Sequence, residues 1–174
     1  MDKLSLIIFS GLPGSGKSTL SEAVAKKMSL PIFSVDPIES SIIRSGIVKS
    51  FETGLAAYLV SEMLATEHLK LGTSVIIDAV NSVKEPREMW RNLSKKNNAE
   101  LIIIECVLNH IIHKKRIESR VRNIHGIQEV TWVDVENCRR EYFPWNEERL
   151  VVDSGISVEV NLGKVLEYIS RNSN

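Results

Sequence analysis

The stretch that decides the fold is Gly11-Leu12-Pro13-Gly14-Ser15-Gly16-Lys17-Ser18-Thr19. It matches the phosphate-loop pattern G-x-x-x-x-G-K-[ST], in which backbone N–H groups of a glycine-rich turn surround an anion. The apolar run 4–9 before it predicts a buried strand. Residues 18–28 after it predict a helix, because Leu20, Val24 and Met28 recur at helical spacing. A strand, a glycine-rich turn and a helix in this order predict a nucleotide-binding loop.

Each part of this loop has a predicted task. Lys17 is expected to reach the β- and γ-phosphates, and the Ser18 hydroxyl to complete the coordination of Mg²⁺. Thr19 lies one step further into the helix, where it could touch the α-phosphate. The expected ligands are therefore ATP and Mg²⁺, and the alternative is a glycine-rich turn without a ligand. The predicted nucleotide-binding residues are Gly11, Pro13, Gly14, Ser15, Gly16, Lys17, Ser18 and Thr19.

The composition is that of one soluble globular domain. The chain has 174 residues, of which 43% are hydrophobic and 25% charged. Its formal net charge is zero, so any nucleic-acid partner would have to bind a local basic patch. We therefore predict a single domain over 1–174, and we favour a small-molecule partner over nucleic acid.

Two further features predict a cytoplasmic protein. The two cysteines, Cys106 and Cys138, cannot form a disulfide framework and suit a reducing compartment. The N-terminus passes directly into the first predicted strand without the layout of a signal peptide. No apolar run approaches the length that spans a membrane, so no membrane partner is expected.

Short apolar runs alternate with helix-like segments along the chain. Most of these runs are apolar at every position, which is typical of strands covered on both faces. Their alternation with helices predicts a parallel sheet in a three-layer α/β/α fold of the P-loop NTPase class. The predicted strands are 4–9, 31–35, 74–77, 101–107 and 156–160.

Two helical segments are predicted in more detail. Residues 53–71 form the clearest amphipathic pattern, and its stripe is predicted to face the core: Leu55, Tyr58, Leu59 and Met63. Between the fourth and fifth predicted strands, 110–146 is predicted to be a helix–loop–helix lid. Its second helix is expected to open at a capping box formed by Thr131 and Asp134.

Two carboxylates are predicted at the ends of strands. Asp36 follows the second strand, and we expect it in extended backbone because Pro37 disfavours helical geometry there. Asp78 ends the third strand. Ligands of open α/β sheets bind beyond the carboxyl ends of the strands, so both side chains should face the phosphate loop. We expect Asp36 to act as a base and Asp78 to hold Mg²⁺; in the alternative, each only caps the next helix.

Basic residues are predicted to complete the site. Arg116 and Arg120 could close over the triphosphate and neutralise charge during transfer, and Arg44 could bind the acceptor. The alternative for the arginine pair is a solvated basic face. The four histidines have no metal-ligand spacing, so no metal beyond the magnesium of the nucleotide is predicted.

With these residues placed, the chain resembles the small P-loop kinases of the nucleoside-monophosphate-kinase-like group. More closely, it is similar to kinases of the zeta-toxin and polynucleotide 5′-hydroxyl kinase type. The matching stretches are 9–19, Val35-Asp36, 75–81 and 113–122. The resemblance implies the strand order 2-3-1-4-5, Asp36 as the acceptor base, Arg120 or Arg116 as the lid arginine, and Asn81 as a substrate-loop residue.

The expected activity is ATP- and Mg²⁺-dependent transfer of the γ-phosphoryl group to a hydroxyl of a small molecule or nucleotide. Pro37 and the neutral charge of the chain depart from the polynucleotide-kinase pattern, so a small-molecule acceptor, as in gluconate kinase, fits equally well. The alternative from another class is a nucleotide-dependent regulatory ATPase without an acceptor. The acceptor and the oligomeric state stay open.

Overall fold

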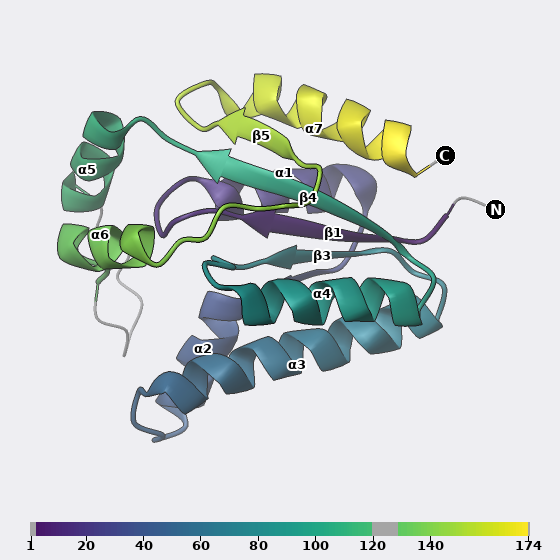
Figure 1. Cartoon of the computed structure of the whole chain (residues 1–174), viewed down its shortest axis with the longest axis horizontal. Coiled ribbons are helices and arrows are strands. Elements are labelled where there is room, and N and C mark those ends of the chain that lie inside the picture. Colours follow the sequence, from purple (N-terminus) through teal and green to yellow (C-terminus); the bar gives the residue numbers. More distant parts are fainter. Residues whose placement is uncertain (1–2, 120–128, 174) are drawn as a thin grey trace.

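A single parallel sheet forms the centre of the molecule (Figure 1). The computed structural model describes residues 3–119 and 129–173. In this part of the chain the strand order is β2-β3-β1-β4-β5, as the resemblance implies. The strands are β1 (Ser5–Ser10), β2 (Ile32–Ser34), β3 (Val75–Asp78), β4 (Glu100–Val107) and β5 (Leu150–Asp153). The helices are α1 (Lys17–Met28), α2 (Val35–Arg44), α3 (Phe51–Lys70), α4 (Lys84–Lys96), α5 (His110–Ser119), α6 (Trp132–Arg140) and α7 (Val158–Asn172).

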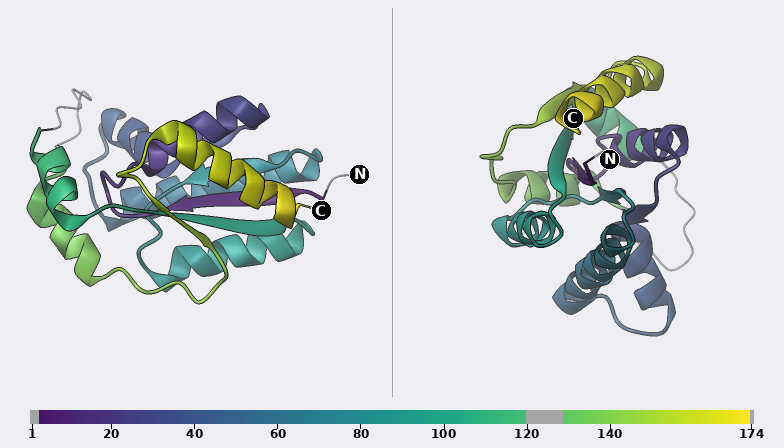
Figure 2. Two further views of the ribbon diagram at one scale, coloured as in Figure 1. Left: turned by 90° about the horizontal axis from the view of Figure 1, so that it is seen from above. Right: turned by 90° about the vertical axis from the view of Figure 1, so that its right-hand side faces the viewer.

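Helices cover both faces of the sheet, which confirms the three-layer α/β/α class (Figures 1 and 2). Alternate residues of β1 enter two separate cores. Leu6 and Ile8 pack with α3 and α4 in one core, and Ile7 and Phe9 pack with α1 and α7 in the other. Within the described residues, no helix is both long and apolar enough to cross a lipid bilayer.

The fifth strand lies earlier than the sequence pattern predicts. Residues 156–160 are not a strand, because the Ser157 hydroxyl accepts the Val160 N–H at 3.4 Å and α7 begins at Val158. The true fifth strand, β5, is a short edge strand beside β4. Its apolar run is only three residues long, 150–152, and Val151 is 49% exposed, so this strand is not covered on both faces as the other strands are expected to be.

The stripe predicted for the buried face of α3 is also wrong. Leu55, Leu59 and Met63 are 46%, 50% and 53% exposed. The buried face consists mostly of small residues, which let α3 approach the neighbouring elements closely: Thr53, Ala57, Ser61, Ala65 and Leu69. A pattern of large apolar residues therefore predicted the wrong side of this helix. Tyr58 is half-buried against the core, as expected.

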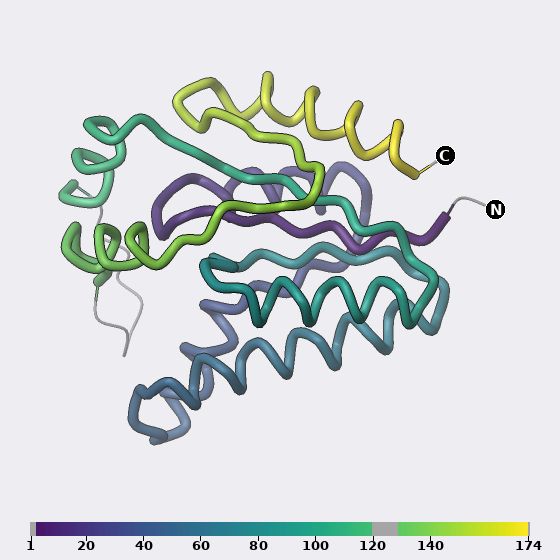
Figure 3. Tube along the Cα trace, in the orientation of Figure 1, coloured from purple at the N-terminus to yellow at the C-terminus, as the bar shows by residue number. Residues whose placement is uncertain are grey.

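The segments that carry the predicted site meet at the carboxyl edge of the sheet. The loop after β1, the start of α2 after β2 and the end of β3 all lie there, with α5 and α6 beyond the end of β4 (Figure 3). Phe9 and Ser34 both pair in register with Asp78. The capping box of Thr131 and Asp134 opens α6 as predicted. The helical insert therefore stands over the edge on which the phosphate loop lies.

Candidate active site

The phosphate loop has backbone conformations that only glycine adopts without strain. Gly11 has φ +144°, and a Cβ atom at this position would lie 2.4 Å from the Cys106 carbonyl oxygen. Gly14 has φ +77°, and a Cβ there would meet Ile117 Cδ1 at 2.4 Å. The first contact is with the backbone of β4 and cannot be relieved by a rotamer change. The loop is therefore held between β4 and the insert helix α5.

The end of α1 that faces the loop is free to receive an anion. Gly16 is the N-cap residue and offers no side chain to the first turn. The first N–H groups of a helix have no intrahelical partner, and they carry partial positive charge. Lys17, the first residue of α1, is only 3% exposed and adds a full charge. This arrangement fits a polyphosphate, as the sequence motif predicts.

Asp78 has the features of a ligand for a hydrated divalent cation. The residue is 4% exposed, and its Oδ1 atom is buried without a hydrogen-bond partner. Burial raises the pKa of the carboxyl group, whereas the Lys17 charge and a hydrogen bond from Ser18 lower it. A buried carboxylate oxygen without a partner, next to the hydroxyl of Ser18, is a donor set that suits Mg²⁺. Ser18 and Asp78 are thus brought together as predicted.

The buried charge of Asp78 should destabilise the fold of the unliganded protein. Its pKa in the folded state lies above the usual value because of burial, so the charged form is disfavoured at any pH above that raised pKa. We expect Asp78→Asn to stabilise the nucleotide-free protein by about 1 kcal/mol at pH 8. The gain should shrink as the pH falls through the raised pKa. Denaturant unfolding of both proteins at several pH values measures it.

The same substitution should remove the contribution of Mg²⁺ to nucleotide binding. Calorimetric titration with AMPPNP, with and without Mg²⁺, provides this second readout. An unchanged magnesium effect in the Asp78→Asn protein would contradict the metal role. If Asp78→Asn lowered the free energy of unfolding of the nucleotide-free protein, the buried charge would not be destabilising and this prediction would be wrong.

Asp36 faces the site from a helix, not from extended backbone. α2 begins at Val35, which places Asp36 in the first turn and Pro37 directly after it. Proline is tolerated in a first turn because its missing N–H would have no intrahelical partner there. The prediction that Pro37 keeps Asp36 in extended backbone is therefore wrong, because both residues lie in the first turn of α2. Asp36 is half-buried, and its charge raises the pKa of Asp78 and of the Tyr58 hydroxyl.

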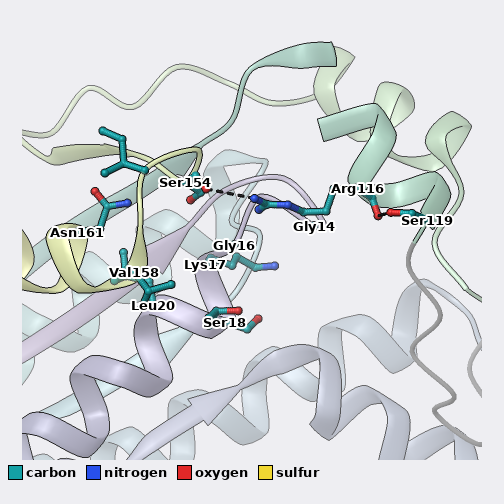
Figure 4. A pocket seen from close by; sticks show the side chains of 12 residues that line it. Gly14, Gly16, Lys17, Ser18, Leu20, Arg116, Ser119, Ser154, Val158 and Asn161 are labelled. Atoms are coloured by element: carbon teal, nitrogen blue, oxygen red, sulfur yellow. Dashed lines mark hydrogen bonds between the residues drawn. The ribbon is translucent and has the colours of Figure 1, made fainter. Parts of the chain in front are cut away.

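Arg116 spans the loop from above and borders a cavity (Figure 4). Its Nη2 donates to the Ser154 carbonyl at 3.2 Å. The cavity beneath has a volume of about 430 Å³ and is lined partly by the phosphate loop, with Lys17, Ser18 and Thr19. On the far side it is lined by residues that the sequence analysis missed: Ser154, Ile156, Val158 and Asn161. Ser154 and Ile156 lie in the β5–α7 turn, and Val158 and Asn161 lie in the first turn of α7; the misplaced fifth strand hid this part of the cavity.

Asn81 lies beside the site but is fully buried. Its Oδ1 accepts the Trp90 Nε1–H at 2.9 Å, and its Nδ2 donates to the Ala79 carbonyl at 3.3 Å. Its backbone N–H bonds the Tyr58 hydroxyl, and its φ is +53°. These contacts give the side chain a task in shaping the loop after β3. Contact with a substrate stays a prediction.

We expect Asn81→Ala to destabilise the fold by about 2 kcal/mol, because Trp90 Nε1 then loses its buried acceptor. Asn98→Ala is the matched control. Asn98 has a similar φ of +50° but an exposed side chain. Replacing it with alanine therefore adds the strain of a left-handed backbone conformation without removing a buried hydrogen bond. The difference in unfolding free energy isolates the buried amide. Equal losses in the two variants would contradict this task for Asn81.

The remaining predicted residues lie at the margins. Arg44 is exposed at the end of α2, and Arg120 lies outside the described residues. The predicted lid interval contains α5 and α6, although the structure leaves part of the loop between them undescribed. Among the described residues, no three His, Cys, Asp or Glu side chains gather as a metal site. The charged residues that the sequence predicted for the site and that the structure places around the loop are Lys17, Asp36, Asp78 and Arg116.

The chain is similar in sequence to parts of longer curated proteins. The chain is 26% identical over 168 residues to threonine synthase-like 1 of Macaca fascicularis, with 95% of this chain and 22% of that protein covered. It thus spans about a fifth of that relative. It is 27% identical over 185 residues to the L-seryl-tRNA(Sec) kinase of Methanococcus maripaludis, with 97% and 67% covered.

Solved structures with this fold include several kinases. A proposed kinase from Chloroflexus aurantiacus has a TM-score of 0.78 at 25% identity, with 99% of each chain covered. A gluconokinase from Sinorhizobium meliloti has a TM-score of 0.71 at 15% identity, with 99% of this chain and 95% of that chain covered. The APS kinase CysC of Mycobacterium tuberculosis, in complex with AMPPNP and APS, has a TM-score of 0.73 at 17% identity, with 98% and 99% covered.

A protein-family model also matches most of the chain. The model of the AAA_33 family, described as an AAA domain, matches residues 6–144. The match contains the phosphate loop, both strand-end carboxylates and most of the insert. The chain therefore belongs to this AAA-domain family, and it has the fold of the small P-loop kinases of the nucleoside-monophosphate-kinase-like group.

Proposed function

We propose that the protein is an ATP- and Mg²⁺-dependent kinase that moves the γ-phosphoryl group to a hydroxyl of a small molecule or nucleotide. One observation carries this proposal. Asp36 and Asp78 both lie near the phosphate loop at the carboxyl edge of the sheet, which supports Asp78 as a metal ligand and Asp36 as the group that meets the acceptor. Kinases among the relatives and the structural neighbours support the same class of reaction.

Each residue has a role in this proposal. Lys17 and the N-terminus of α1 bind the phosphates, and Arg116 holds the nucleotide from the insert. Mg²⁺ on Ser18 and Asp78 would neutralise charge on the β- and γ-phosphoryl oxygens. Asp36 orients the acceptor hydroxyl and takes its proton. The hydroxyl oxygen then bonds to the γ-phosphorus as the bond to the β–γ bridging oxygen breaks, and ADP leaves.

A regulatory ATPase is the competing function from another class, and the residue after Asp78 argues against it. Ala79 is 1% exposed and carries no group that could activate water. Many motor-type ATPases place a glutamate at this position. The residue that follows Asp78 therefore supplies no carboxylate for hydrolysis, whereas Asp36 supplies one for an acceptor.

A panel of acceptors tests the proposed function. ADP formation from Mg-ATP is followed alone and with sugars, sugar acids, nucleosides, antibiotics and 5′-hydroxyl oligonucleotides. We expect one acceptor class to raise ADP formation at least about a hundredfold over the rate with water alone. Stimulation by the oligonucleotides alone would indicate a polynucleotide kinase. Brisk hydrolysis that no hydroxyl compound affects would overturn the kinase proposal in favour of the ATPase.

A further inference from the structure

His113 connects the insert directly to the phosphate loop. The residue lies on α5 and is only 1% exposed. Its Nε2 atom is 2.8 Å from the Pro13 carbonyl oxygen, which belongs to the loop. On its other side, the ring makes an edge contact with Trp132 of α6 at 5.5 Å between centroids. This buried ring of α5 therefore contacts two other segments of the chain, the phosphate loop and α6.

The neighbours of the ring determine which nitrogen carries the proton. Arg139 Nη2 lies 3.5 Å from His113 Nδ1, and a guanidinium can only donate, so Nδ1 is the acceptor. The proton of the neutral ring is then on Nε2, which donates to Pro13. Burial lowers the pKa of His113 most, the hydrogen bond to the Pro13 carbonyl raises it, and the charges of Arg139, Arg116 and His110 lower it again, so that the pKa lies below its usual value. Glu136 faces this group too, but it pairs with Arg139 and His110. His113 is therefore neutral at pH 8.

The bond to Pro13 also fixes the direction of the next N–H group. A trans peptide is planar, and its C=O and N–H point in opposite directions. With the Pro13 carbonyl turned outward to His113, the Gly14 N–H must point away from α5. Ile117 packs on the same outer face of the loop, where a Cβ on Gly14 would lie 2.4 Å from its Cδ1. The insert thus holds the outer side of this peptide and leaves the inner N–H free.

We propose that His113 is a positioning residue that holds the Pro13–Gly14 peptide so that the Gly14 N–H is directed at the bound polyphosphate. This inference rests on the proposed function, because it assumes that the loop binds a nucleotide. In this proposal α5 does more than carry Arg116. The insert prepares the phosphate loop for the nucleotide through His113, and Arg139 of α6 keeps the ring in the required tautomer.

Binding of AMPPNP with Mg²⁺ at pH 8, measured by calorimetry, tests this inference without any turnover. We expect His113→Leu to weaken binding about tenfold, because the Pro13–Gly14 peptide loses its buried donor. His113→Gln should recover most of the affinity, since its amide can donate to the same carbonyl. His110→Gln is the matched control. His110 also contacts the Trp132 ring, at 5.0 Å, but makes no bond to the loop, so its loss should leave affinity unchanged.

The tautomer provides a second readout on the unaltered protein. Nitrogen-15 NMR of the histidine rings should show His113 neutral at pH 8 with its proton on Nε2. A proton on Nδ1, or a charged ring, would overturn the inference even if His113→Leu fails to fold. Wild-type affinity in a folded His113→Leu protein would overturn it as well. Wild-type protein that does not bind AMPPNP would instead overturn the proposed function, and this inference with it.

Discussion

Asp36→Asn is expected to lower the rate of phosphoryl transfer by about a thousandfold. Its affinity for Mg-AMPPNP should change by less than about twofold, because in the proposed mechanism Asp36 contacts the acceptor hydroxyl and not the phosphates of the nucleotide. Asparagine keeps the shape of the side chain and its place in the first turn of α2. It loses the negative charge and the ability to take a proton. Single-turnover transfer and calorimetric binding on the same preparation separate these two effects.

Glu39→Gln is the matched control for this experiment. Glu39 lies on the same helix, and its Oε1 accepts the Thr53 hydroxyl at 2.9 Å, which directs it toward α3. Neutralising it removes the same charge from α2 without touching the proposed base. We expect its transfer rate to stay within about threefold of the wild type. If Asp36→Asn and Glu39→Gln lower the rate equally, the charge of α2 matters and Asp36 is not the base.

The second large effect is expected from Lys17→Met. Removal of a buried charged donor should weaken AMPPNP binding by about a hundredfold and the transfer rate still more. The methionine fills similar space, so the shape of the loop should persist. The binding measurement used for His113→Leu reports the first effect, and transfer at saturating nucleotide reports the second.

We also expect Lys17→Met to lower the free energy of unfolding of the unliganded protein, and a second substitution tests the cause. Burial raises the pKa of Asp78 and the Lys17 charge lowers it, so removal of that charge leaves the buried carboxylate with only hydrogen bonds to stabilise its charged form. The double variant Lys17→Met/Asp78→Asn should regain the lost stability but not the nucleotide affinity. Equal stability of Lys17→Met and wild type would contradict the coupling between these two side chains.

The sequence predicted the parts of this site that follow directly from strands with continuous apolar runs. The phosphate loop lies after β1, and Asp78 ends β3, where the carboxyl edge of the sheet places them together. Both predictions depend on local spacing, which a single sequence shows fully. The strand order came from the resemblance to small kinases, because periodicity does not determine which strands are neighbours.

The features that were missed depend on tertiary context. β5 is an edge strand with one exposed face, and its Leu-Val-Val run is too short to indicate a strand by itself, so the cavity residues that follow it were missed. α3 buries alanine and serine and exposes leucine, because close packing selects small side chains. His113 gave no signal in the sequence. Its importance comes from a bond to Pro13, one hundred residues away.

The most direct measurement follows labelled phosphate from [γ-32P]ATP into an acceptor, in parallel for the wild type and Asp36→Asn. The acceptor is the one that most stimulates ADP formation in the panel. The proposed mechanism predicts one labelled acceptor per ADP formed by the wild type, and almost no labelled acceptor from Asp36→Asn despite normal AMPPNP binding. Label found only in inorganic phosphate, at the same rate in both proteins, would contradict the assignment of this protein as a kinase.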